Sequence, residues 1–352
     1  MSISAKELAE KLNVSAATVS MVLNNKPGIS NDTRERVLSA ANEYGFDFSK
    51  LGAKTGTAGS IQLVIYKKHG LVVADTPFFA QVIESIEQEC RHEDMSLQIT
   101  YFYSTGDPDE QMEVIKRSNC DGILLLGTEM QLEDLEHFVS LNSQLVVLDT
   151  YFDELDLDFV TINNIRGMVM AADYLFSKGF SEIGYLRSSY DIVNFCERAE
   201  GYCKSLKKHG AEYKTELIHR LTPSAEGAYK DMKKLLETGC PVASAYVADN
   251  DLIAAGAIKA FKEHGLNIPE DVSVIGFDNM PVCDLLEPPL TTVDVPKKAF
   301  GSLGFKQLTN KIQRNSNGYL RTMLSPAMRI RKSVIKKPMT KKYLGGKSAW
   351  QK

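Results

Sequence analysis

The 352-residue sequence lacks the features that mark several protein classes. No apolar run approaches the roughly 20 residues that a transmembrane helix needs, so we expect no membrane partner. Residues 1–20 are polar and periodic, without the apolar centre of a signal peptide, which predicts a cytoplasmic protein. No GxGxxG motif opens a helix after the first expected strand, and there is no P-loop. No Ser/His/Asp or Cys/His set stands out either, so we expect neither an enzyme nor a bound cofactor.

Cysteine and tryptophan are also scarce. The six cysteines are scattered, with no CxxC pair and no histidine at ligand spacing, so we interpret them as reduced thiols rather than disulfides or a metal site. They are Cys90, Cys120, Cys196, Cys203, Cys240 and Cys283. The one tryptophan, Trp350, lies near the C-terminal end, so phenylalanine or tyrosine would have to stack on any flat ligand elsewhere.

Acidic residues are absent from residues 295–352, which carry 15 lysines and arginines. The net charge of the whole chain is nevertheless −4. Residues 1–60 hold seven basic and six acidic side chains, a weak electrostatic footprint for a nucleic-acid binder. If this segment binds DNA, one copy should bind weakly, and we expect two copies to bind side by side.

Residues 4–24 predict two short helices joined by a tight turn. Ser4 and Glu7 have the spacing of a capping box, and Asn13 marks the turn between the helices. Ser15 is placed to cap the second helix, whose inner face would be Val19, Val22 and Leu23. Its outer face would then present Ala16, Ala17, Ser20, Met21 and Asn24.

A third helix is expected between Ser30 and Gly45, with Val37, Ala41 and Tyr44 facing inward. Three such helices form a small bundle of the helix-turn-helix type. The same spacing is also compatible with an ordinary helical hairpin that has no role in DNA binding.

Beyond a Gly-rich stretch at residues 52–60, short apolar runs alternate with helical segments, which predicts an α/β fold with parallel sheets. Strands are expected at 61–66, 97–103, 122–127, 144–149, 160–163, 182–187, 243–248 and 272–277. Helices are expected around 79–92, 108–118, 166–178, 196–209, 224–238 and 251–264. Four of these helices end at a glycine, as helices often do: Gly179, Gly210, Gly239 and Gly265.

The sequence resembles the lactose-repressor/galactose-repressor family of bacterial transcription regulators. The matching motifs are VS-x-x-TVS at Val14–Ser20, VLN at Val22–Asn24 and IS-x-x-TR at Ile29–Arg34. The resemblance continues along the chain to RIRKS at Arg329–Ser333. An ordered series of this length is far more specific than a single motif.

The resemblance implies a two-lobed body like that of periplasmic binding proteins, behind the helix-turn-helix domain. We expect a DNA-binding domain at 1–46, a hinge at 47–60, an effector-binding body at 61–340 and a basic tail at 341–352. The first lobe would comprise 61–162 and 293–325, and the second lobe 163–292 and 326–340. The chain would cross between them near Thr161–Asn164, Thr291–Val293 and Ser325–Met328.

In the family, positions matching Ser15, Thr18, Ser20 and Asn24 contact the DNA backbone, and those matching Ala16, Ala17 and Met21 face the bases. The commonest family pattern has arginine where Met21 stands, so bidentate recognition of guanine from this position is lost. We expect contacts to thymine methyl groups instead. The alternative is a domain that no longer distinguishes sequences.

The family's hinge helix inserts a leucine into the minor groove. Here the corresponding segment, residues 46–54, is about two residues shorter than usual, and Leu51 is its one plausible wedge. Packing of Leu51 against Phe46 or Phe48 is the alternative.

The resemblance also places a ligand site between the two lobes, where ligands of open α/β sheets bind. The candidate residues are Phe78, Phe79, Asp149, Arg198, Asn250 and Asp278. For Asp251 we favour helix capping over ligand binding, and a surface ion pair is the alternative role of Arg198. The loop at 67–75 is about five residues longer than usual for the family.

We therefore expect a ligand-responsive transcription regulator, most simply a repressor. It would bind a palindromic operator in double-stranded DNA as a homodimer, under the control of a sugar, nucleoside or similar polar metabolite. The alternative is a solute-binding protein with the same body fold.

Overall fold

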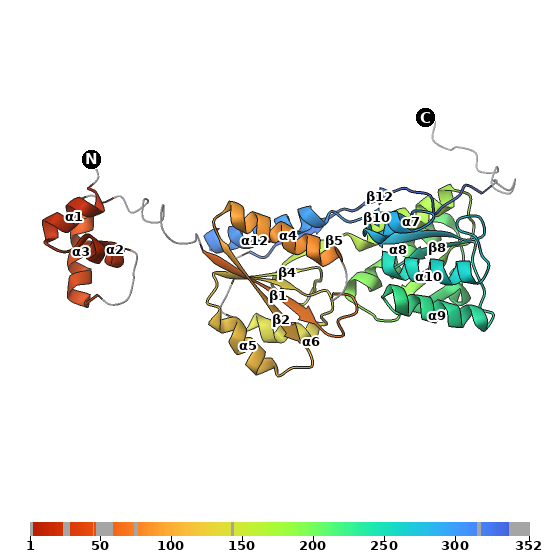
Figure 1. The fold of residues 1–352 in the computed structure, drawn as a ribbon, viewed down its shortest axis with the longest axis horizontal. Coiled ribbons are helices and arrows are strands. Elements are labelled where there is room, and N and C mark those ends of the chain that lie inside the picture. The colour runs from red at the N-terminus through yellow and green to blue at the C-terminus, as the bar shows by residue number, and fades with distance from the viewer. Residues whose placement is uncertain are drawn as a thin grey trace, which may run out of the picture. The chain divides into compact units, whose positions relative to one another are not determined.

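The computed structural model describes residues 3–23, 29–44, 46, 59–73, 77–141, 144–314 and 318–337. The chain divides into two compact units, Met1–Gly59 and Ser60–Lys352, and each has its own core. Figure 1 shows a helical first unit and a second unit in which helices cover two sheets. None of the described helices is long and apolar enough to cross a membrane.

The first unit contains the three predicted helices, α1 (Ala5–Leu12), α2 (Ala16–Leu23) and α3 (Asn31–Glu43). Serine side chains begin them as expected. Ser4 and Glu7 form the predicted capping box, and Ser15 Oγ accepts a hydrogen bond from the Thr18 amide at 3.0 Å. Asn13 adopts the left-handed conformation (φ 53°) that turns the chain from α1 into α2.

The inward side chains of the three helices form one small cluster, which fixes the outer face of α2. Its buried members are Leu8, Ala9, Val19, Val22, Val37, Ala40 and Ala41. The inward placement expected for Tyr44 is wrong. Its side chain is 39% exposed, and the Lys11 ammonium lies 4.3 Å from the ring centroid. The aromatic ring therefore lies at the surface, where its apolar face interacts with a charge.

The first lobe of the second unit is a parallel six-stranded sheet in the order β11-β5-β4-β3-β1-β2. The strands are β1 (Ser60–Lys67), β2 (Ser96–Tyr103), β3 (Gly122–Leu126), β4 (Gln144–Leu148), β5 (Asp158–Ile162) and β11 (Arg321–Leu324). Helices α4 (Pro77–His92) and α12 (Lys297–Arg314) cover one face. Helices α5 (Pro108–Arg117) and α6 (Leu132–Val139) cover the other (Figure 1).

The second lobe is a six-stranded sheet in the order β12-β10-β9-β8-β6-β7, parallel except for the last partner, β12. The strands are β6 (Gly184–Ser188), β7 (Ile218–Leu221), β8 (Ala245–Ala248), β9 (Ser273–Asp278), β10 (Thr291–Asp294) and β12 (Ala327–Arg329). Helices α7 (Asn164–Ser177) and α8 (Val193–His209) pack on one face. Helices α9 (Ala225–Glu237) and α10 (Asp251–Glu263) pack on the other, and short helices lie at η2 (Thr215–Leu217) and α11 (Val282–Leu285).

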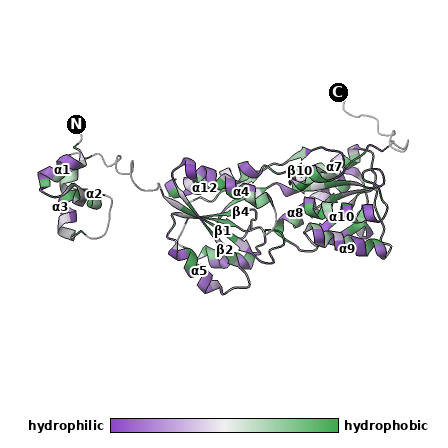
Figure 2. Cartoon of the chain, viewed as in Figure 1, coloured by the Kyte–Doolittle hydropathy of each residue, from purple (hydrophilic) through white to green (hydrophobic). Residues whose placement is uncertain are grey.

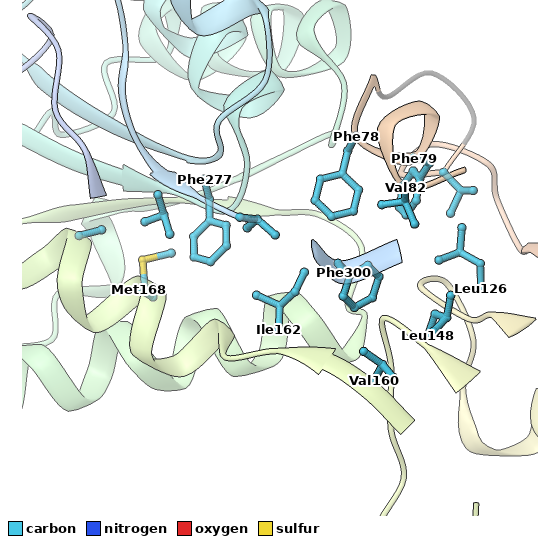
Figure 3. Close-up of a cluster of buried hydrophobic side chains, with 14 of the residues drawn as sticks. Phe78, Phe79, Val82, Leu126, Leu148, Val160, Ile162, Met168, Phe277 and Phe300 are labelled. Carbon is cyan, nitrogen blue, oxygen red and sulfur yellow. The ribbon is translucent and has the colours of Figure 1, made fainter. Parts of the chain in front are cut away.

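The chain passes between the two sheets three times: from β5 to α7, from β10 to α12, and from β11 to β12. Strand β10 stays in the second sheet as far as Asp294, so the second passage follows Asp294. The largest buried cluster includes side chains of both lobes, among them Phe78, Phe277 and Phe300 (Figure 3). Hydrophilic residues line the outward sides of α9 and α12 (Figure 2).

The predicted glycine stops are confirmed, because Gly179, Gly210, Gly239 and Gly265 all follow helices and have positive φ angles. The expectation of a buried strand at 97–103 is only half right. Strand β2 lies at the edge of its sheet, and Ile99, Tyr101 and Tyr103, on one of its faces, are each 45–47% exposed. An edge strand is covered by fewer neighbours than a central one, which the local sequence does not reveal.

Close packing between α9 and α10 generates a stability prediction. A Cβ at Gly256 would lie 2.4 Å from the Ala225 carbonyl oxygen, a backbone atom that cannot move aside easily. We expect Gly256→Ala to lower the free energy of unfolding by about 1–3 kcal/mol. Gly318→Ala is the matched control, because a Cβ at Gly318 would meet nothing within 4 Å, and its effect should stay within about 0.5 kcal/mol. Urea unfolding followed by circular dichroism measures both, and equal midpoints would contradict the prediction.

Candidate functional site

A partly open cavity of about 30 Å³ lies between the two lobes of the second unit. We call it the pocket. From the first lobe it is lined by Val72, Phe78, Phe79, Thr128 and Asp149. From the second lobe it is lined by Ile192, Asn194, Phe195, Arg198, Asn250 and Asp278. Apolar and charged side chains thus face one pocket.

The polar lining residues stand where strands end and helices begin. Asp149 directly follows β4, and Asp278 is the last residue of β9. Both adopt positive φ angles, 65° and 105°, which turn the chain away from the sheet at that point. Asn250 is the N-cap of α10, where its Oδ1 accepts a hydrogen bond from the Ile253 amide at 2.8 Å. The carboxyl ends of parallel strands therefore place these groups around the pocket.

Arg198 of α8 is buried and holds several of these elements together. Its Nε donates to Asn164 Oδ1 at 2.9 Å, and its Nη1 donates to the carbonyl oxygen of Asp249. Its Nη2 lies 3.3 Å from Asp278 Oδ1, and the guanidinium carbon lies 3.7 Å from the centroid of the Phe277 ring. A buried guanidinium needs several such partners, because its N–H groups would otherwise be left without water or an acceptor.

Asp149 is the least satisfied of the lining groups. Thr128 Oγ1 donates to Asp149 Oδ2 at 2.7 Å, whereas Asp149 Oδ1 is buried and has no hydrogen-bond partner among the described residues. Burial raises the pKa of Asp149 to about 6, although the Thr128 bond and the charge of Arg198 oppose this shift. An acceptor in this condition is placed to receive a donor from a bound molecule.

A second network connects Arg198 to the first lobe. Asn164, the first residue of α7, donates to Asn194 Oδ1 at 3.0 Å and to Glu197 Oε2 at 2.9 Å. Glu197 Oε1 in turn accepts from the Tyr151 hydroxyl at 2.8 Å. The ring of Tyr151 lies 3.3 Å from the guanidinium carbon of Arg321 in β11. The pocket is thus joined by these contacts to two of the passages between the lobes.

In the first unit, α2 presents a small, mostly polar surface. Ser15, Ala16 and Ser20 are exposed, while Thr18 and Met21 are half-buried. The buried Val19 and Val22 hold the opposite face of α2 against the rest of the unit. Small side chains on an exposed helix allow the close approach that a DNA groove requires.

Comparison with protein families matches both units. Residues 4–47 match the family of bacterial regulatory proteins of the lacI type. Residues 172–334 match the periplasmic binding protein-like domain family. The chain thus combines a lacI-type helix-turn-helix domain with a periplasmic-binding-protein-like domain. The predicted family and fold class are thereby confirmed.

Relatives of this regulator align along nearly its whole length. The transcriptional repressor PurR of Mannheimia succiniciproducens is 28% identical over 337 residues, which cover 94% of this chain and 98% of that protein. The ribose operon repressor of Haemophilus influenzae is 29% identical over 335 residues, with the same coverage. The operon regulator NtdR of Bacillus subtilis is 28% identical over 312 residues, 88% of this chain and 93% of that protein.

Solved structures share the fold of this regulator. A complex of the transcriptional regulator CelR with cellobiose has a TM-score of 0.71 at 24% identity and covers 94% of this chain and 99% of that one. The lac repressor dimer bound to operator has a TM-score of 0.70 at 20% identity, over 95% and 100% of the two chains. A LacI family regulator from Enterococcus faecium with bound ribose has a TM-score of 0.69 at 24% identity, over 79% and 100%.

All six ligand-binding candidates taken from the sequence of this regulator line the pocket: Phe78, Phe79, Asp149, Arg198, Asn250 and Asp278. Whether they bind a ligand stays a prediction. Of the DNA-binding candidates, Ser15, Ala16, Thr18, Ser20 and Met21 lie on or beside α2. Ala17 lies in α2, but its side chain is not among those described, and Asn24 and Leu51 are outside the described residues altogether.

Two interpretations from the sequence, the alternative role of Arg198 and the favoured role of Asp251, are wrong. Arg198 is not part of a surface ion pair, because only 4% of it is exposed. Asp251 does not cap α10, since Asn250 does. Asp251 is instead buried, accepts hydrogen bonds from the Met280 amide and the Thr292 hydroxyl, and has a pKa that burial raises to about 7.

Sequence reasoning missed five pocket residues: Val72, Thr128, Ile192, Asn194 and Phe195. A signal existed for Thr128, which follows the apolar run at 122–126 much as Asp149 follows the run at 144–148. Asn194 and Phe195 stand in the first turn of α8, which begins three residues before the expected helix. No group of three or more His, Cys, Asp or Glu side chains in the described ranges is placed to hold a metal ion.

The raised pKa of Asp149 predicts a pH dependence of stability. An unfolded aspartate has a pKa near 4, so between pH 4 and pH 6 the folded state holds a proton that the unfolded state releases. The contribution of the protonated Asp149 carboxyl to the free energy of unfolding is complete below about pH 4 and is lost as the pH rises through 6. Asp149→Asn removes this titration, so relative to wild type it should gain roughly 1–3 kcal/mol between pH 4.5 and pH 7. Urea unfolding at several pH values measures the difference.

The control for this experiment is Asp156→Asn, an exposed aspartate of the same lobe. This variant should follow the wild-type pH profile. If Asp149→Asn also follows it, the shift proposed for the buried carboxyl is refuted.

Proposed function

We propose that the protein is a transcriptional repressor that binds a palindromic operator as a homodimer and responds to a small polar effector in the pocket. One observation carries the proposal. A single chain joins a helix-turn-helix unit with an exposed polar α2 to a body that gathers buried charged groups from two lobes around one cavity. The first feature suits recognition of DNA, and the second suits recognition of a metabolite. We place the regulator in the cytoplasm and assign it no catalytic role.

For DNA binding we assign α2 to the major groove. The hydroxyl groups of Ser15, Thr18 and Ser20, together with Asn24, would contact phosphates. Ala16, Ala17 and Met21 would approach the bases, where methyl groups favour thymine. Leu51 would enter the minor groove between two subunits.

For the effector we propose a ring-sized molecule rich in hydroxyl or amide groups. Asp149 Oδ1 offers a buried acceptor, and Arg198 and Asp278 offer charged partners for further hydrogen bonds. The rings of Phe78 and Phe79, whose centroids lie 5.0 Å apart, provide an apolar wall for a flat face. Ribose and cellobiose are bound in two of the structures that share this fold, and both are polyhydroxylated rings.

For the homodimer we propose contact through the exposed face of β2. Ile99, Tyr101 and Tyr103 stand at alternate positions of this edge strand, so they form one continuous apolar stripe. Two copies would also bring two helix-turn-helix units to one palindrome, which offsets the weak charge of a single unit. The lobes are joined by three passages, so effector binding between them would change how the two copies position their helix-turn-helix units. The pocket and the DNA-binding surface would then be coupled sites.

The DNA-binding assignment predicts the outcome of selecting binding sites from random duplexes. We expect a palindrome whose affinity falls steeply with salt and which has thymine opposite Met21. Met21→Arg should shift that position to guanine, with a preference of about 1–3 kcal/mol. An invariant guanine opposite the native Met21 would contradict the thymine hypothesis, and absence of any palindrome would contradict the operator function.

The effector assignment predicts the result of a thermal-shift screen of sugars, nucleosides and amino acids. A compound that raises the melting temperature of the wild type should lose at least tenfold in affinity with Arg198→Lys or Asp278→Asn. The first variant removes the bidentate guanidinium donor, and the second removes a charged acceptor. The exposed pair Arg329→Lys and Asp109→Asn provides matched controls. Equal affinity in all four variants would place the effector outside the pocket.

A further inference from the structure

The loop that follows β1 makes an unusual set of contacts. Its described part after the strand, Lys68–Val73, lies at the carboxyl end of β1, next to the pocket. We call this segment the strap. It contains no helix or strand, so its backbone amides need partners from elsewhere in the protein.

One carboxylate supplies those partners. Glu129, in the turn after β3, is 1% exposed and accepts hydrogen bonds from five strap amides. Its Oε2 accepts from Lys68, His69 and Gly70 at 2.9, 3.1 and 2.9 Å. Its Oε1 accepts from Val72 and Val73 at 2.9 and 3.2 Å. The strap is therefore wrapped around a single buried anion.

The local electrostatics agree with an ionised Glu129. Burial raises its pKa, but backbone hydrogen bonds from Gly70, Val72 and Lys68, together with the nearby His69, lower it further than burial raises it, so the net pKa is lowered. His69 Nδ1 lies 3.3 Å from Glu129 Oε1 and accepts a hydrogen bond from the Leu71 amide. Burial lowers the pKa of His69, so its ring is neutral at neutral pH. Backbone amides supply most of the hydrogen bonds that stabilise the carboxylate.

The strap reaches the second lobe. Val72 is buried in a cluster with Ile192 and Phe195, which stand at the start of α8. The His69 ring centroid lies 4.4 Å from that of Tyr190. These contacts lie beside the pocket, which Val72, Ile192 and Phe195 also line.

We propose that the strap is a latch between the lobes, positioned by Glu129, that holds the body closed over the pocket before any effector binds. Its function is distinct from DNA binding and from effector recognition, since it concerns the ligand-free body. It also gives the strap a place in the pocket, because Val72 supplies part of the apolar side from the first lobe. An effector then enters a pocket in which the position of Val72 depends on Glu129, a residue that does not line the pocket.

Two measurements on the ligand-free, full-length protein test the latch. Hydrogen exchange of residues 68–73 reports whether Glu129 holds the strap. Pulsed electron paramagnetic resonance between spin labels at Lys116→Cys in α5 and Lys234→Cys in α9, both exposed, reports the distance between the lobes. The labelled protein carries serine at Cys120, Cys196, Cys203 and Cys240, the cysteines that are not buried.

Three variants separate the steps. Glu129→Gln places an N–H group among amides that need an acceptor, so exchange of the strap should accelerate at least tenfold and the inter-lobe distance distribution should broaden. Val72→Ser leaves Glu129 intact but removes the apolar contact, so it should broaden the distance distribution with little change in exchange. Glu136→Gln, an exposed residue of α6, is the matched control and should behave like the wild type.

The proposal is overturned if the wild type already shows a broad distance distribution, or if Glu129→Gln leaves strap exchange unchanged. It is also overturned if the strap loosens while the lobes keep their distance in both variants. If Glu129→Gln does not fold, Val72→Ser alone decides whether the strap holds the lobes together.

Discussion

The body of this regulator depends on one buried cation, the guanidinium of Arg198. Its nitrogens bind Asn164 at the first passage between the lobes, the Asp249 carbonyl after β8 and the Asp278 carboxylate at the end of β9. Three segments far apart in sequence are thereby held around one planar group. Removing one member of such a buried set typically costs about 3–5 kcal/mol, because the remaining charge stays buried without its partner. The geometry of the pocket is therefore also a condition of the stability of the second lobe.

Buried side chains that bind several chain segments at once are also found elsewhere in the body. Asn164 accepts a hydrogen bond from Arg198 and donates one to Glu197, which accepts another from Tyr151. The pocket and the passages between the lobes are therefore parts of one hydrogen-bonded network. Glu129 holds the strap in a comparable way, with one anion and several backbone amides. In both places one buried charged side chain holds together chain segments that no shared helix or sheet connects.

Much of the fold follows from local sequence. Serines at helix starts, glycines at helix ends and apolar runs at strands predicted most elements within a few residues, because these signals act within one turn or one strand. The elements that were missed are short or polar and form through contacts with distant segments: helices α6, η2, α11 and α12 and strands β7, β10, β11 and β12. The six pocket candidates came from the family resemblance and the ends of strands. Asn194, Ile192 and Val72 could not be predicted, because their neighbours are set by how the two lobes meet.

The three passages between the lobes also govern the order in which the protein can be completed during synthesis. The first unit needs only residues up to about α3 for its own core, so it can fold while most of the chain is unmade. The first lobe cannot be finished until α12 covers its sheet and β11 pairs with β5, and the second lobe waits for β12. A nascent chain therefore holds a folded helix-turn-helix well before it holds the pocket that would control it.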